Sequence, residues 1–400
     1  MLKKIIFTMT LVILSILLFT SGNVLAHHSD AHVSIEVNEN QSLDLANHSK
    51  SAILIERDTG NILFDKNAEE KLPPASMTKI MTLLLIMEAL EKGQLSLDET
   101  IRVSEKAASM GGSQIFLEAG EEMLAEDILK GIAVASGNDA SVAMAERIAG
   151  SEQAFVEMMN NKVDQLGLKS TKFQNATGLP AEDHYSTAHD MAIMAQALLK
   201  YEDITKYTSI YEDYLRKGKD NEFWLVNTNK LVRFYEGGVD GLKTGYTREA
   251  KYCLTATAEK NGMRTIAVVL GGANSTKERN SDVSQLLDYA FSKYETKQLY
   301  EKNQTVTSFE WLKADKQKVD VVTSDSVSVL FEKGTDLSKI DTKITINQNI
   351  DLPLEKGTMV GKLQVLDDDK LISETDLVVH DDINHANVFQ LFKRTFQSFF

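Results

Sequence analysis

The chain has 400 residues, of which 43% are hydrophobic and 25% charged, proportions typical of a globular protein with a core large enough for an enzyme. Its 43 Lys and Arg against 58 Asp and Glu give a formal net charge of −15, which argues against a nucleic-acid-binding protein. The single cysteine, Cys253, excludes an internal disulfide and a cysteine-ligated zinc site, so the fold must depend on core packing. The length predicts two or three domains.

Residues 1–26 have the pattern of an export signal peptide. Lys3 and Lys4 precede an uncharged, largely apolar run at residues 5–19, and small or apolar residues at 24–26 offer a cleavage site. The alternative is a transmembrane anchor, because the run approaches the lower length limit for crossing a bilayer. Residues 27–50 are polar and contain histidines, and we expect a flexible leader; the alternative, a metal site, lacks acidic or cysteine partners at a recognisable spacing.

Residues 51–297 predict one α+β domain. Strands are expected at 51–56, 61–65, 239–244, 252–259 and 263–270. Helices are expected at 76–91, 125–135, 140–149, 152–166, 187–200 and 277–294. The first of these helices is apolar on nearly every face and therefore belongs in the middle of the domain. Strands at both ends with helices between them predict an antiparallel sheet that joins the two ends of the domain.

Two further segments follow the predicted α+β domain. Residues 304–380 read as short strands and turns, which predicts a small all-β domain. Residues 384–400 have a helical period, with Lys393 and Arg394 on the polar half of the wheel. The apolar half carries five phenylalanines, Phe389, Phe392, Phe396, Phe399 and Phe400. We expect an amphipathic helix lying in a membrane surface; the alternative is a helix docked onto the β-domain.

Ser76 and Lys79 form the first motif that points to chemistry. They are three residues apart at the start of the buried helix, so their side chains share one face. Both the helix dipole and partial burial lower the pKa of a lysine at that place, and a neutral amine can accept a serine proton. The motif alone is weak, because a Ser-x-x-Lys pattern is expected about twice by chance in a chain of this length.

Two more motifs follow in the chain. Ser136-Gly137-Asn138 interrupts two apolar helical segments, where the glycine permits a tight turn that presents a hydroxyl and an amide together; a simple capping turn is the alternative. Lys243-Thr244-Gly245 ends a strand at which a ligand with a carboxylate could bind as a neighbouring strand, and a polar strand end is the alternative. All three motifs in this order have a chance expectation of about one in a thousand.

With these motifs the sequence resembles the serine-type D-alanyl-D-alanine carboxypeptidases, low-molecular-mass penicillin-binding proteins of the active-site-serine penicillin-recognising superfamily. The resemblance spans nearly the whole chain after the predicted signal and includes residues 51–55, 175–180, 184–188 and 227–231. It implies a β-lactamase/transpeptidase-like catalytic domain that needs no metal or cofactor. It also implies release of D-alanine from peptidoglycan pentapeptides ending in D-Ala-D-Ala, which limits cross-linking, and covalent binding of β-lactam antibiotics.

The resemblance implies a role for each motif residue. Ser76 would be the nucleophile, Lys79 its base and Ser136 a proton relay to the leaving amine. The backbone N–H groups of Ser76 and Tyr246 would form the oxyanion hole. The remaining residues would bind substrate: Asn138 the amide, and Lys243 and Thr244, beside Gly245, the terminal carboxylate.

One departure from the family pattern concerns the carboxylate. Some relatives have an arginine where this chain has Thr228, and Arg248 is our candidate to replace it. His184 is expected to be structural, and substrate contact is its less favoured role. Two other functions stay open: a β-lactamase, although no added carboxylate base is identified, and a catalytically silent penicillin sensor or scaffold. The signal and tail predict an exported protein attached peripherally to the outer face of the cytoplasmic membrane.

Overall fold

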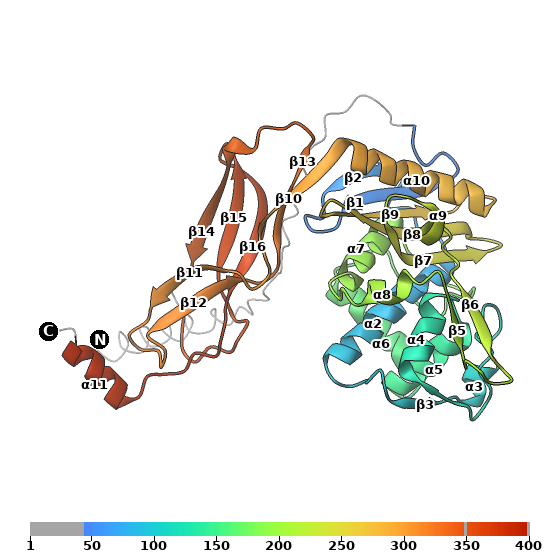
Figure 1. The fold of residues 1–400 in the computed structure, drawn as a ribbon, viewed down its shortest axis with the longest axis horizontal. Coiled ribbons are helices and arrows are strands. Elements are labelled where there is room, and N and C mark those ends of the chain that lie inside the picture. Colours follow the sequence, from blue (N-terminus) through green and yellow to red (C-terminus); the bar gives the residue numbers. More distant parts are fainter. Residues whose placement is uncertain (1–43, 348–349, 398–400) are drawn as a thin grey trace, which may run out of the picture. The chain divides into compact units, whose positions relative to one another are not determined.

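The computed structural model describes residues 44–347 and 350–397 (Figure 1). Its first domain is built on a five-stranded antiparallel sheet in the order β2-β1-β9-β8-β7. The strands are β1 (Ser51–Glu56), β2 (Ile62–Lys66), β7 (Val239–Thr247), β8 (Lys251–Lys260) and β9 (Met263–Leu270). The first two strands and the last three thus meet in one sheet, which confirms the predicted α+β class.

The sheet is covered on both faces. In β1, Ile53 and Ile55 enter one hydrophobic core while Ala52 and Leu54 enter the other, because successive strand residues point to opposite faces. Helix α10 (Thr276–Lys293) packs against β8 and β9, and α7 (Ala188–Leu198) packs against β1 and β9 (Figure 1). This cover on both faces buries every residue of β1 and β9, and most of these residues are apolar.

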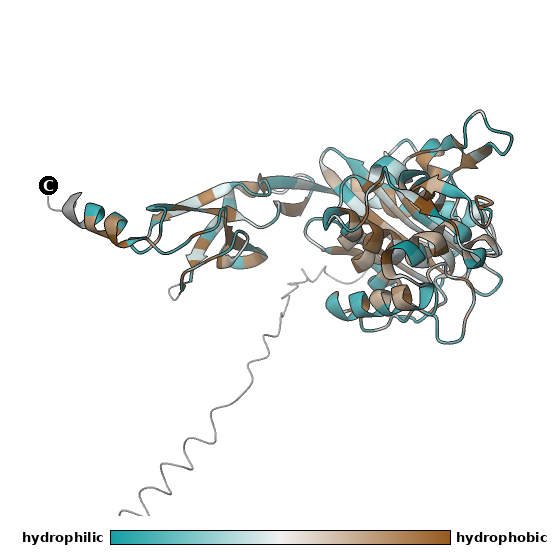
Figure 2. Cartoon of the chain, turned by 90° about the horizontal axis from the view of Figure 1, so that it is seen from below, coloured by the Kyte–Doolittle hydropathy of each residue, from teal (hydrophilic) through white to brown (hydrophobic). Residues whose placement is uncertain are grey.

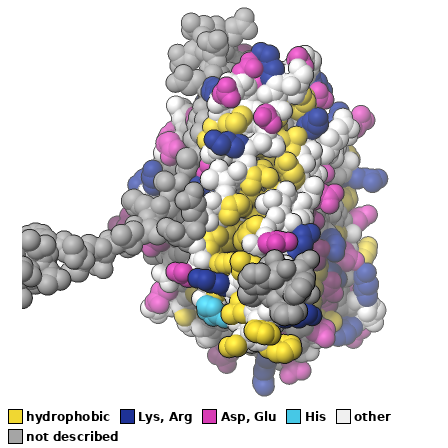
Figure 3. All heavy atoms as spheres, turned by 90° about the vertical axis from the view of Figure 1, so that its left-hand side faces the viewer, with side chains coloured by type: hydrophobic (Ala, Val, Ile, Leu, Met, Phe, Trp, Pro, Cys, Tyr) yellow, Lys and Arg dark blue, Asp and Glu magenta, His cyan; other side chains and the backbone are white. Residues whose placement is uncertain are grey.

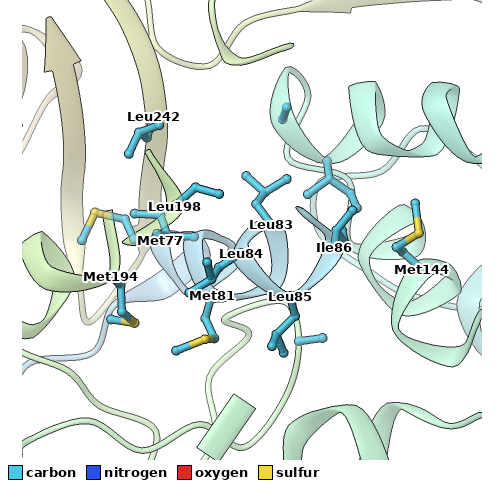
Figure 4. Close-up of a cluster of buried hydrophobic side chains, with 14 of the residues drawn as sticks. Met77, Met81, Leu83, Leu84, Leu85, Ile86, Met144, Met194, Leu198 and Leu242 are labelled. Carbon is cyan, nitrogen blue, oxygen red and sulfur yellow. The ribbon is translucent and has the colours of Figure 1, made fainter. Parts of the chain in front are cut away.

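Helix α2 (Lys79–Glu91) runs through the larger core, as its sequence predicts. Its buried side chains point toward Met194 and Leu198 of α7 on one side and Met144 of α5 (Asn138–Ala149) on the other (Figure 4). The remaining helices of this domain are α3 (Glu105–Ala108), α4 (Ala125–Ala133), α6 (Glu152–Gln165), α8 (Ile204–Thr208) and α9 (Leu231–Phe234). Hydrophobic residues concentrate inside the domain and hydrophilic ones lie on its outer loops (Figure 2).

The start of α2 differs from the expectation. Ala75–Thr78 form a separate 3₁₀ turn, η1, so Ser76 precedes the α-helix instead of belonging to it. In a 3₁₀ turn, residues three apart lie almost directly above one another, which still places Ser76 and Lys79 on one edge. Two small two-stranded sheets were not predicted, because their strands are too short to show an alternating pattern: β3 (Thr100–Arg102) with β4 (Glu122–Leu124), and β5 (Glu212–Leu215) with β6 (Phe223–Val226).

The second domain is all-β. Its main sheet has the order β11-β12-β16-β15-β14, and β10 pairs with β13. The strands are β10 (Tyr294–Tyr300), β11 (Thr305–Glu310), β12 (Lys318–Thr323), β13 (Val327–Glu332), β14 (Ile340–Ile346), β15 (Met359–Asp367) and β16 (Lys370–Val379), with a 3₁₀ turn, η2, at Leu337–Lys339. Inward-facing valines and leucines form its own core, including Val321, Leu363 and Leu377. Helix α11 (Val388–Gln397) ends the described chain.

The N-terminal end of the described chain is more ordered than the leader prediction allowed. His48 donates its backbone N–H and offers Nδ1 to the buried Asp282 of α10, and the Ser49 hydroxyl donates to the same carboxylate at 2.6 Å. The reason is a tertiary partner 233 residues away. The predicted signal at 1–26 lies outside the described residues. Within the described ranges, every helix is too short or too polar to cross a membrane.

Candidate active site

The amine of Lys79 joins three parts of the domain. Its Nζ lies 3.3 Å from Ser76 Oγ, 2.6 Å from Asn138 Oδ1 and 2.7 Å from the carbonyl oxygen of Thr177. The lysine is fully buried. Two of the three predicted motifs therefore meet at one nitrogen, and the contact with Thr177 was not predicted.

The surroundings of this amine favour its neutral form. Burial holds the pKa of Lys79 well below its usual range, and the nearby charge of Lys243 lowers the pKa further, against a smaller opposing effect of Asp139. The sequence pointed to burial and the helix dipole, and the structure identifies burial as the main cause. A neutral amine 3.3 Å from a hydroxyl can act as its base.

The Ser136-Gly137-Asn138 turn lies between α4 and α5, as predicted. Ser136 is buried and has a left-handed backbone with φ of +63°, a conformation that is unusual for a residue other than glycine. Asn138 begins α5; its Nδ2 donates to the Gly111 carbonyl at 2.7 Å while its Oδ1 faces Lys79. The buried Asp139 carboxylate accepts the N–H groups of Ile115 and Leu117, which fastens the 111–117 loop beside the turn.

The third motif lies on β7, which is an edge strand of the sheet. Lys243 is buried, and its pKa is lowered to about 7, first by burial and then by the charge of Arg279. The Thr244 hydroxyl donates to Thr228 Oγ1 at 2.8 Å. A Cβ at Gly245 would lie 2.8 Å from the Pro74 carbonyl oxygen, so only glycine lets β7 approach the turn that carries Ser76. Tyr246, the next residue, is 56% exposed.

Arg279 of α10 was missed by the sequence reasoning. Its guanidinium is buried next to β8, its Nε and Nη2 donate to Asn280 Oδ1, and burial lowers its pKa to about 10. The helical period could have found it, because Arg279 lies on the same face as the buried Val283 and Leu286. Arg248, the predicted replacement for the missing arginine, is exposed in the turn after β7.

His184 lies behind the nucleophile turn. Its Nδ1 accepts the backbone N–H of Gln174 at 3.3 Å, so the neutral ring carries its proton on Nε2, which lies 2.8 Å from Thr78 Oγ1. Burial lowers the pKa of His184 to about 4. A neutral imidazole thus links the 171–186 segment to η1. Across residues 44–347 and 350–397, no group of three or more His, Cys, Asp or Glu side chains is placed to hold a metal ion.

Comparison with known proteins places this geometry in a family. Residues 36–274 match the family described as D-alanyl-D-alanine carboxypeptidase, and residues 294–385 match the C-terminal domain of penicillin-binding protein 5. The chain is 56% identical over 352 residues to the D-alanyl-D-alanine carboxypeptidase DacF of Bacillus subtilis, covering 88% of this chain and 90% of that protein.

Solved structures give the same result. Penicillin-binding protein 5 of Haemophilus influenzae is similar with a TM-score of 0.68 and 31% identity, over 87% of this chain and 99% of that one. Penicillin-binding protein D2 of Listeria monocytogenes in its ampicillin-bound form is similar with a TM-score of 0.55 and 29% identity, over 63% of this chain and all of that one. The chain therefore belongs to the D-alanyl-D-alanine carboxypeptidase family of low-molecular-mass penicillin-binding proteins.

Proposed function

We propose that this protein hydrolyses the terminal D-alanine from peptidoglycan pentapeptides through an acyl-enzyme on Ser76. The observation that carries the proposal is the buried amine of Lys79, which lies 3.3 Å from Ser76 Oγ and has a strongly lowered pKa. Carboxypeptidase activity is also what the family membership and the 56% identical relative support.

In the first step, Ser76 Oγ attacks the penultimate D-alanine carbonyl while Lys79 takes the hydroxyl proton. The backbone N–H groups of Ser76 and Tyr246 stabilise the oxyanion. The C–N bond then breaks, Ser136 relays a proton to the leaving amine, and D-alanine departs. Water hydrolyses the remaining ester and restores Ser76. The strained backbone of Ser136 and its position between two buried helices support a functional role for this hydroxyl.

The edge of β7 is the proposed binding surface for the peptide. An extended peptide can align with an edge strand, while the Asn138 side chain binds its amide. Lys243 and Thr244 bind the terminal carboxylate, and Arg279 adds positive potential to the same region. Arg248 remains a candidate from the exposed side. β-Lactams acylate the same serine, in keeping with the ampicillin-bound relative.

The deciding experiment measures D-alanine release from a pentapeptide ending in D-Ala-D-Ala, beside the rate of penicillin hydrolysis. We expect D-alanine release, stable covalent labelling by penicillin and slow penicillin turnover. Fast penicillin hydrolysis without D-alanine release would identify a β-lactamase. Labelling with neither activity would identify a penicillin sensor.

The carboxylate grip is tested with a substrate whose terminal carboxylate is amidated. We expect kcat/KM to fall by about 2–4 kcal/mol of lost charged pairing. Arg248→Ala should reproduce part of this loss with the acid substrate and none with the amide. Equal turnover of both substrates would refute a carboxypeptidase, and an unchanged Arg248→Ala variant would remove that residue from the site.

We further propose that the protein is exported by residues 1–26 and attached peripherally to the outer face of the cytoplasmic membrane by α11. Val388 and Phe389 are 84% and 77% exposed, an apolar surface suited to the headgroup boundary of a bilayer. Hydrophobic side chains are exposed among charged ones in the view of Figure 3. The side chains of Phe396, Phe399 and Phe400 lie outside the described part of the chain.

Contacts of α11 with the β-domain support one orientation. Arg394, which the sequence places on the polar half of the helix, donates to the carbonyl oxygens of Ala314 at 2.6 Å and Asp315 at 2.9 Å. The Arg394 side of α11 thus faces the 312–315 loop, while Phe389 and Phe392 on the apolar side are 77% and 69% exposed. Docking of α11 on the β-domain and its attachment to a membrane are therefore compatible, because the Arg394 side of α11 contacts the β-domain and the exposed apolar side can contact the membrane.

Sedimentation with anionic lipid vesicles tests the attachment. A protein ending at residue 383 should stay in solution and keep its activity on a soluble peptide. Phe389→Glu with Phe392→Glu should weaken binding, since each buried ring contributes about 1.5–3 kcal/mol before ordering costs. The proposed anchor would be refuted if full-length mature protein did not sediment with the vesicles, or if the double variant bound them as well as wild type.

A further inference from the structure

A short loop at residues 175–179 is built around one amide side chain. Asn175 Oδ1 accepts the backbone N–H groups of Thr177 at 3.1 Å and Gly178 at 2.7 Å, together with the Thr177 hydroxyl at 3.0 Å. Its Nδ2 donates to the Leu179 carbonyl at 2.9 Å. The loop is thereby held in one conformation by its own hydrogen bonds.

This loop contacts α2 at two positions on one face. The Thr177 carbonyl accepts Lys79 Nζ at 2.7 Å, and the Ala176 carbonyl accepts the Thr82 hydroxyl at 2.8 Å. Residues 79 and 82 are three apart in the helix, so both carbonyls bind side chains on the same face of α2. The place of the loop therefore decides where the Lys79 amine is held.

The same loop lies in close contact with the backbone at the nucleophile, Ser76. Gly178 has φ of +82°, and a Cβ built on it would lie 1.8 Å from the Ala75 carbonyl oxygen, 2.4 Å from the Ala75 carbonyl carbon and 2.9 Å from the Ser76 nitrogen. All three atoms are backbone, so no side-chain rotation can make room. Ala75 itself has a left-handed φ of +48°, which leaves this peptide little conformational freedom.

We infer that Gly178 is a positioning residue for acylation. Its missing side chain lets one loop set two reacting groups together: the Ser76 backbone through direct contact and the Lys79 amine through the neighbouring carbonyl. A side chain at 178 must push the loop and the Ala75–Ser76 peptide apart, which separates base from nucleophile. This inference rests on the proposed roles of Ser76 and Lys79.

Gly178→Ala is the test, with Gly150→Ala as its matched control. Gly150 has nearly the same φ, +80°, but no atom lies within 4 Å of a Cβ built there. Both variants carry the same cost of a side chain at positive φ, and Gly178→Ala should lose additional thermal stability from its contact with the Ala75–Ser76 peptide. Gly178→Ala alone should lower the acylation rate by a fluorescent penicillin about 10²-fold, the usual effect of a 1 Å misplacement. For the peptide, kcat should fall more than KM changes.

Acylation by Gly178→Ala within about twofold of wild type, or an equal loss in Gly150→Ala, would overturn the inference. If Gly178→Ala does not fold, Asn175→Asp takes its place, because it removes the donor to Leu179 and loosens the loop. Its control is Asn160→Asp, whose Nδ2 donates to the Val156 and Phe173 carbonyls away from Ser76. Only Asn175→Asp should slow acylation. Failure of wild-type protein to release D-alanine would instead count against the proposed function.

Discussion

Replacing Lys79 by methionine tests the central feature of the site. Methionine fills a similar volume without an amine, so the buried helix keeps its packing. If Lys79 is the base for Ser76, acylation should fall by about 10²- to 10⁴-fold. Each tenfold step is about 1.4 kcal/mol, so the activation barrier should rise by about 3–6 kcal/mol.

The structure also sets the expected effect on folding. The variant leaves the Asn138 Oδ1 and Thr177 carbonyl acceptors without the Lys79 donor that now lies 2.6 and 2.7 Å away. An unpaired buried acceptor costs about 1–3 kcal/mol, so the loss of stability is at most about 2–6 kcal/mol. Part of this loss is offset, because the variant no longer buries the Lys79 amine, whose burial is unfavourable enough to lower its pKa.

The assay is stopped-flow labelling with a fluorescent penicillin, with the folded fraction measured by circular dichroism in the same buffer. Lys200→Met is the control, because Lys200 is exposed at the end of α7. We expect the control to label at the wild-type rate. A Lys79→Met variant that labels equally fast, or whose slower labelling matches its unfolded fraction, would refute the assignment of Lys79 as the base.

Three other predictions concern single residues. Ser76→Ala should abolish both D-alanine release and penicillin labelling, and labelling at another residue would contradict its role. Burial and, after it, the charge of Arg279 lower the pKa of Lys243 to about 7. Arg279→Gln removes the second cause and raises this pKa, so the alkaline fall of kcat/KM for the peptide should move to higher pH; an unmoved profile would contradict this coupling. Burial raises the pKa of Glu56 to about 7, so the stability that comes from its protonation is complete below about pH 4.5 and is lost as pH rises through 7. In Glu56→Gln, the free energy of unfolding, measured with urea, should therefore depend less on pH between about pH 5 and 8. An unchanged pH dependence would mean that another group dominates it.

Local sequence pattern was sufficient for much of the fold. The apolar run after Ser76 predicted the central helix, because a helix buried on all sides needs apolar residues on all sides. The strands predicted at 252–259 and 263–270 form the β8–β9 hairpin, and Asn261-Gly262 between them accept the positive φ that such turns require; here the φ values are +54° and +80°. Motif spacing also selected the family, which the comparisons confirm.

Other features depend on contacts that no local pattern encodes. Lys79 and the Thr177 carbonyl are 98 residues apart in the chain, and Asp282 binds a segment more than 230 residues away. The lowered pKa values of Lys79 and Lys243 come first from burial, which exists only after the chain has folded.

The sequence by itself therefore predicted which residues carry the chemistry and determined the class of fold that holds them, because residue type and period are local properties. Only the tertiary structure decided that Ser76 lies on a 3₁₀ turn, that Arg279 adds its charge near Lys243, and that Arg394 binds backbone carbonyls of the β-domain. The physical reason is that distance, burial and hydrogen-bond partners arise from packing between segments that are remote in sequence.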